Sequence, residues 1–211
     1  MKSKRVAVVA SIAAVLAAGC SDSGQGAEAD GSQAHTPAGY HHVAVEAASV
    51  TFAAPEGWLD LAPEELDDHA ASALVTLAEA AGVSEGELHN NAQELDLFIV
   101  EPAPADPSAP ESISVTHEPG EVVGGLPTEQ EVGALFESVG ADIRGFETVA
   151  APAGEVVYGV SEMSGARANP HMAMAFAFND DGDLVVITIG ADDAERLADV
   201  THTLATTIAP A

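Results

Sequence analysis

The sequence predicts an α+β domain built on a mainly antiparallel sheet. Apolar residues alternate at period two in several short segments, and these segments come in pairs separated by turn residues. Other segments carry apolar residues at helical spacing and lie between the groups of strands. Hairpins interrupted by helices favour an antiparallel sheet packed with helices over a doubly wound parallel sheet.

The strands are predicted from alternation and from turn chemistry. An alternating strand is expected at 50–54 and ends at Pro55, and a strand covered on both faces is expected at 97–100, which is apolar throughout. Short alternation at 113–115 predicts another. Two hairpins follow, one around the Pro- and Gly-containing turn at 152–154 and one around the turn at 179–183.

Four helices are predicted. Two of them lie at 66–81 and 84–92. The third begins at Thr128, which forms a capping-box pattern with Glu131, and stops at Gly140. Its i, i+3, i+4, i+7 stripe consists of Val132, Leu135, Phe136 and Val139. The last helix opens with the acidic residues Asp192, Asp193 and Glu195. Its apolar face consists of Leu197, Val200, Leu204 and Ile208.

The first twenty residues have the layout of an export signal. Three basic residues stand in positions 2–5, and the charge-free apolar run at 6–18 is too short for a stable spanning helix. The segment Leu16-Ala-Ala-Gly-Cys20 resembles the lipobox of bacterial lipoproteins, although the usual Leu three residues before the cysteine is Ala17 here. The alternative is a plain signal with an incidental cysteine. We predict a lipoprotein signal peptide at 1–19 and a lipid anchor on Cys20.

The remaining chain is predicted to hold a tether and one domain. Residues 20–45 comprise the lipidated cysteine and a flexible tether rich in small polar residues, and 46–211 form a single globular α+β domain. Cys20 is the only cysteine, so a disulfide is excluded, and its lipid would exclude a cysteine nucleophile. The expected location is the extracytoplasmic face of the cell membrane.

The charge of the chain is strongly acidic. Cleavage after residue 19 would leave three arginines, no lysine and 34 acidic residues, a formal charge of −31. Such a surface repels nucleic acid and anionic lipid headgroups, so the membrane contact has to come from the lipid on Cys20. General adaptation to a salty or high-GC proteome is one explanation of this charge, and a specific cation-binding role is the other.

Two clusters invite a metal hypothesis. His35, His41 and His42 lie close together in the tether, and imidazole suits zinc, copper and nickel, but their spacing matches no known metal motif. Oxygen ligands gather at 179–183, but this segment lacks an EF-hand loop, and a hairpin turn explains it. We predict no metal site and no cofactor.

No catalytic residue is predicted. Ser161 lacks the second glycine of a nucleophile elbow, and His117-Glu118 lacks the second histidine of a zinc-protease motif. We therefore expect no enzyme.

A resemblance rests on residues 50–58, where a strand ends in Pro55-Glu-Gly-Trp58. Together with the helix at 128–139, the two hairpins and the closing helix, this order resembles the actinobacterial LpqN-type lipoproteins, which share the PsbP-like α/β/α sandwich, over about residues 43–209. The resemblance implies a fold and a cell-envelope setting and transfers no catalytic residue. Trp58 itself is predicted to anchor the core, with ligand stacking as the alternative.

The function expected from the sequence is a surface-tethered, non-enzymatic cell-envelope lipoprotein that binds or scaffolds a partner. The partners are the membrane, through lipidated Cys20, and an envelope protein or a small ligand. A cation or small-ligand binding protein is the alternative.

Overall fold

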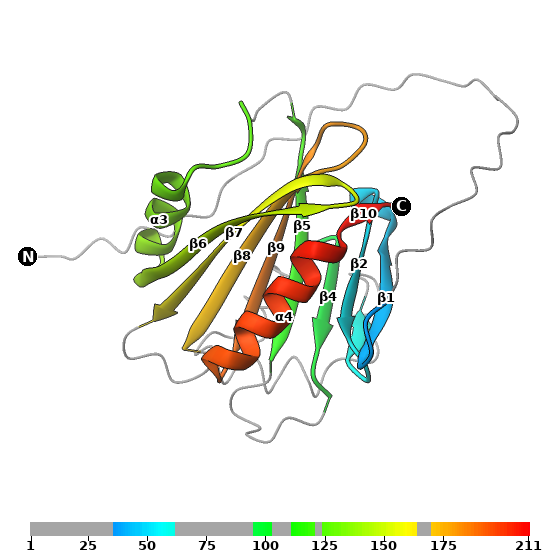
Figure 1. Ribbon diagram of the computed structural model, residues 1–211, viewed down its shortest axis with the longest axis horizontal. Helices are drawn as coiled ribbons and strands as arrows, with labels where there is room; N and C mark the ends of the chain where they lie inside the picture. The colour runs from blue at the N-terminus through cyan, green and yellow to red at the C-terminus, as the bar shows by residue number, and fades with distance from the viewer. Residues whose placement is uncertain (1–35, 62–94, 103–110, 121–123, 164–169) are drawn as a thin grey trace, which may run out of the picture. The chain divides into compact units, whose positions relative to one another are not determined.

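Strands form most of the described structure (Figure 1). The computed structural model describes residues 36–61, 95–102, 111–120, 124–163 and 170–211, all within a unit that begins at Ala34. The strands are β1 (Tyr40–Val45), β2 (Val50–Pro55), β3 (Leu59–Leu61), β4 (Leu97–Val100), β5 (Ser112–Glu118), β6 (Ala141–Ala151), β7 (Gly154–Met163), β8 (His171–Phe178), β9 (Leu184–Ala191) and β10 (Ala209–Pro210). The helices are the 3-10 turn η1 (Glu46–Ala48), α3 (Glu129–Ser138) and α4 (Ala194–Thr207).

The strands form two antiparallel sheets. The larger sheet has the order β3-β4-β5-β9-β8-β7-β6, and the smaller one has the order β1-β2-β10. Adjacent strands β6 and β7 form the predicted hairpin around 152–153, and β8 and β9 form the other. The predicted α+β class with a mainly antiparallel sheet is confirmed.

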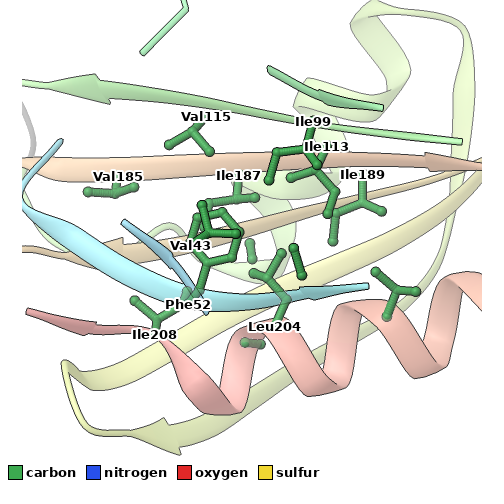
Figure 2. Close-up of a cluster of buried hydrophobic side chains, with 14 of the residues drawn as sticks. Val43, Phe52, Ile99, Ile113, Val115, Val185, Ile187, Ile189, Leu204 and Ile208 are labelled. Atoms are coloured by element: carbon green, nitrogen blue, oxygen red, sulfur yellow. The ribbon is translucent and has the colours of Figure 1, made fainter. Parts of the chain in front are cut away.

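The main core lies between the large sheet, the small sheet and α4 (Figure 2). Phe52 comes from β2, Leu204 from α4 and Ile187 from the middle of β9, and all three are fully buried. Trp58 is also buried in this cluster, at the turn between β2 and β3. The predicted core role of Trp58 is therefore confirmed.

The other face of the large sheet carries a second apolar cluster with α3. Side chains alternate along a strand, so the alanines of β8 face the main core, while its methionines and phenylalanines face the opposite side. Val132 and Phe136 of α3 pack there against Val157 and Phe176. Helices therefore cover both faces of the sheet.

Two expectations about strands are corrected. The tether was expected to extend to residue 45, but Tyr40–Val45 form β1, because Val43 and Val45 are buried in the main core and the strand pairs with β2 along its whole length. Strand β6 is longer than its sequence indicates, because a bulge between Ile143 and Gly145 interrupts the alternation. The predicted helices at 66–81 and 84–92 lie outside the described residues.

The structure confirms the predicted ends of helix α3 and corrects its predicted apolar stripe. Thr128 and Glu131 form the capping box, and Gly140 follows the helix with a φ of 81°. Hydrogen bonds from Thr128 lower the pKa of the Glu131 carboxyl. Of the four stripe residues only Val132 and Phe136 are buried, because α3 contacts mainly β6 and β7 and leaves one flank free.

Candidate functional site

The predicted lipid anchor, Cys20, lies outside the described residues, as do His35, His69 and His89. Within the described ranges, no helix is long and apolar enough to cross a membrane.

The histidines of β1 point to opposite sides of the strand. His41 is half-buried and lies beside β2 and β3, whereas His42 is exposed. Both ring nitrogens of His41 are within hydrogen-bond distance of protein oxygens, Nδ1 with the Pro55 carbonyl at 3.0 Å and Nε2 with the Asp60 carboxylate at 3.1 Å. The structure therefore does not bring His41 and His42 to a common site.

The other described histidines are also apart. His117 on β5 contacts Asp96, with 2.7 Å between Nδ1 and Oδ2. His171 begins β8, and His202 lies on the exposed side of α4. The part of the chain that the structure describes holds no group of three or more His, Cys, Asp or Glu side chains that could hold a metal ion.

The oxygens of the 179–183 turn are used within the fold. Asn179 Oδ1 accepts a hydrogen bond from the Asp183 amide at 2.8 Å, and Asp183 Oδ1 accepts one from the Gly120 amide at 2.9 Å. The Asn179 amide group donates to the Ala48 carbonyl at 3.0 Å. These contacts hold the β8–β9 hairpin against β5 and η1, as expected of a structural turn.

Ser161 is buried on β7, and its hydroxyl donates to the Met172 carbonyl of β8 at 3.1 Å. This bond gives the hydroxyl a structural partner and places it in the sheet rather than at a surface.

Two glutamates form side-chain hydrogen bonds to residues distant in sequence or on another strand, and the sequence did not indicate these bonds. Arg196 Nε of α4 donates to Glu111 Oε2 at 3.3 Å, just before β5, where the Glu111 side chain is only 8% exposed. Burial raises the pKa of the Glu111 carboxyl, and the Arg196 guanidinium opposes this shift. On the large sheet, the Tyr158 hydroxyl donates to Glu147 Oε2 at 2.6 Å, and burial, followed by this carboxylate, raises the pKa of Tyr158. In each of these two contacts a glutamate accepts a hydrogen bond, from an arginine in one and from a tyrosine in the other.

The structure also shows exposed apolar side chains along one flank of α3, which the sequence alone did not indicate. Leu135 is 44% exposed and Val139 is 50% exposed, and they lie one turn apart on the helix. Leu59, on the edge strand β3, is the third exposed large hydrophobic residue in the described part of the chain, at 47%.

The position of this flank follows from helix geometry. A Cβ on Gly133 would lie 3.9 Å from Ile143 of β6, so the Gly133 side of α3 lies over β6. Leu135 stands about 200° around the helix from Gly133 and therefore faces away from β6. We call Leu135 and Val139 the α3 flank.

Comparisons with known proteins bear on the fold. No protein-family model and no curated protein sequence matches the chain. Among solved structures, the chain is similar to the PsbP protein of the cyanobacterium Synechocystis sp. PCC 6803, with a TM-score of 0.50 and 16% identity, covering 87% of this chain and 98% of that one. It is also similar to LpqN of Mycobacterium tuberculosis, described as involved in cell envelope biogenesis, with a TM-score of 0.44 and 14% identity over 76% of this chain and 82% of that one.

Both proteins belong to the kinds that the sequence resemblance named, and the identities are low. The likeness to PsbP extends over nearly all of that protein and agrees with the antiparallel sheet and the helices on its two faces. The chain has a PsbP-like α+β fold.

Proposed function

We propose that this chain is a lipid-anchored protein of the extracytoplasmic membrane face whose PsbP-like domain binds an envelope protein and catalyses no reaction. The observation that carries the binding role is the α3 flank. Two large aliphatic side chains are exposed one turn apart.

The charge around the flank defines the chemistry of the partner. The charged residues of α3 are all acidic, Glu129, Glu131 and Glu137, and the chain as a whole has 34 acidic residues against six basic ones. A partner segment that fits this surface has an apolar anchor for Leu135 and Val139, flanked by Lys or Arg. Such complementarity speeds association and excludes acidic partners.

The predicted N-terminal features supply the attachment. A lipid on Cys20 and a polar tether would hold the domain at the membrane while its acidic surface is repelled from anionic headgroups. The structural role of Ser161 supports a binding function over a catalytic one, because its hydroxyl donates to a backbone carbonyl of the fold.

The binding role is tested with a double variant, Leu135→Ser with Val139→Ser, against the control Leu59→Ser, which changes an equally exposed leucine on another element. Each chain is crosslinked in intact cells of the organism of origin, and the crosslinked peptides are identified. We expect the wild type and L59S to capture the same Lys- or Arg-flanked apolar segment, and the double variant to lose about tenfold or more of it, as when binding hot spots are truncated. Capture should fall with added salt.

Two outcomes would count against this function. Equal capture of the same segment by the double variant would remove the α3 flank from the interface. Capture of an acidic segment would contradict the charge argument. Unfolding curves of the three proteins check that the substitutions leave the domain folded.

A further inference from the structure

Strand β6 forms one edge of the large sheet and pairs there with β7 (Figure 1). It runs from Ala141 to Ala151, whereas β3 at the opposite edge of the sheet has three residues. The helices lie over the faces of the sheet, because α3 contacts β6 and β7 on one face and α4 packs on the other. Among the described residues, no backbone group outside β7 is hydrogen-bonded to the backbone of β6. The outer edge of β6 is therefore open in the part of the chain that the structure describes.

The register of the β6–β7 hairpin shows which backbone groups face this open edge. The two-residue turn between the strands makes Ala151 and Gly154 a hydrogen-bonded pair. Bonded and non-bonded pairs alternate along an antiparallel ladder, so every second residue back from Ala151 bonds to β7. The residues between them direct their amide and carbonyl groups outward. We call these three residues the β6 edge: Phe146, Thr148 and Ala150.

The two halves of β6 differ in how they protect this edge. Proteins commonly protect edge strands with bulges, charges or proline, which keep other strands from pairing there. The first half of β6 has the bulge between Ile143 and Gly145, and it carries the charged residues Asp142 and Arg144. The half from 146 to 151 has neither a bulge nor a proline. This half therefore presents a regular edge to which another strand can bond.

We propose that the β6 edge binds an extended, cationic segment of a partner protein, which adds a strand to the large sheet beside 146–151. Main-chain hydrogen bonds to the three outward residues hold the segment, and the side chains across from it determine which segment binds. The site uses the backbone of β6, so it is a second binding surface and does not rest on the α3 flank.

Charge determines the chemistry of the segment. Glu147 is exposed, and its Oε2 accepts a hydrogen bond from the Tyr158 hydroxyl at 2.6 Å, which holds the carboxylate beside the edge. Arg144, the basic residue of β6, is already paired with Glu162 through its Nε at 3.2 Å. The chain has a net charge of −28, so a second copy would be repelled from this edge. A segment that carries Lys or Arg is attracted to it.

The register also predicts the order of side chains in the segment. Glu147 and Val149 bond to β7, so they would form the closely spaced, non-hydrogen-bonded pairs with an added antiparallel strand. Lys or Arg fits opposite Glu147, and an aliphatic residue fits opposite Val149. Thr148 and Ala150 are exposed and point to the other face, where a small or β-branched residue fits opposite each of them.

The probe for this site is the peptide acetyl-Lys-Thr-Val-Thr-Lys-Thr-amide, which has the required order when it lies antiparallel to β6. It is titrated into the full chain in a nonionic detergent, and NMR measures the shift and the hydrogen exchange of single amides. We expect saturable shifts on β6. At saturation, exchange of the Phe146, Thr148 and Ala150 amides should slow by about tenfold or more, because each gains a hydrogen bond in the bound state.

Two altered peptides are the controls for the probe. An acidic analogue, acetyl-Glu-Thr-Val-Thr-Glu-Thr-amide, keeps the backbone and reverses the charge. A version of the cationic peptide that is methylated at every backbone nitrogen keeps the charge and loses the donors. Neither should bind at the concentrations that saturate β6 with the parent peptide.

Two substitutions at one position are the matched pair for the protein. Thr148→Pro removes an outward amide and leaves the bonds to β7 in place, and it should weaken binding by about tenfold or more. Thr148→Val keeps the amide and should bind as the wild type does. Glu147→Gln should weaken binding by about threefold and reduce its dependence on salt. The double variant of the α3 flank should bind the peptide normally, so the two surfaces are judged separately.

Several results would overturn the proposal. They are the absence of saturable shifts on β6, equal binding by Thr148→Pro, and equal binding by the acidic peptide. Slow exchange of the three outward amides in the free chain would show that the edge is already paired. The pairing would be with a second copy if this protection grew with protein concentration, and with the chain itself if it did not. If Thr148→Pro does not fold, the methylated peptide decides, since binding with the affinity of the parent peptide would refute strand addition.

Discussion

Replacing Phe52 by Ala should destabilise the domain by about 3–5 kcal/mol, because the change removes a large ring from a close-packed core and leaves a cavity. Phe52 is 1% exposed and comes from the central strand of the small sheet. Its ring lies among aliphatic side chains of the large sheet and α4 (Figure 2). Chemical denaturation of the wild type and F52A measures the difference.

Phe178→Ala is the matched control for that experiment. Phe178 is half-buried on the other face of the sheet, at the end of β8. Less apolar surface is removed from contact there, so the loss should be clearly smaller. An F52A protein that unfolds at the wild-type denaturant concentration would show that the small sheet does not contribute to one core with α4.

Gly159→Ala should separate α3 from the sheet and cost about 1–3 kcal/mol, the usual range for overpacking. A Cβ at this position of β7 would lie 2.6 Å from Val132 Cγ1 and 2.9 Å from Phe136 Cε2. Both atoms belong to buried side chains of α3, so these side chains, or the helix that carries them, have to shift for the methyl group to fit. Denaturation together with NMR shifts of the α3 amides reports both effects.

The control for G159A is Gly133→Ala in the same interface. The nearest atom to the added Cβ would be Ile143 Cγ2 at an ordinary 3.9 Å, and alanine favours the helix over glycine. G133A should therefore be neutral or more stable. If G159A left the α3 amide shifts unchanged, the packing described for this helix would be wrong.

Much of the fold could be predicted because its signals are local. The capping box at Thr128 and the turn at 179–183 are defined by residues a few positions apart, and both occur as predicted. The alternation in β2 and β8 likewise predicts the strands without knowledge of their partners.

The rest depends on contacts distant in sequence. Strand β1 was assigned to the tether because it follows a segment rich in small polar residues, and pairing with β2 over the full strand decides its structure. The bond from Asn179 to Ala48 joins residues 131 positions apart, and no local pattern indicates it.

The α3 flank could not be predicted for a similar reason. Its apolar stripe is regular, and the position of α3 over β6 and β7 determines which half of the stripe is buried. Gly159 marks where α3 packs, because the absence of a side chain there leaves room for Val132 and Phe136. Recognising this role requires the pairing of β6 with β7. The residues of the His41 contact likewise come from three strands.

The attachment of the chain through Cys20 is the central claim, and the most direct measurement is fractionation of cells that produce Cys20→Ser after labelling with an acyl-chain probe. The account predicts that the wild type takes up the label and sediments with membranes. C20S should take up none and should be released into the medium or stay uncleaved, because the acidic domain offers no basic patch as a second attachment. A processed, unlabelled C20S protein that stays with the membranes as the wild type does would contradict the claim.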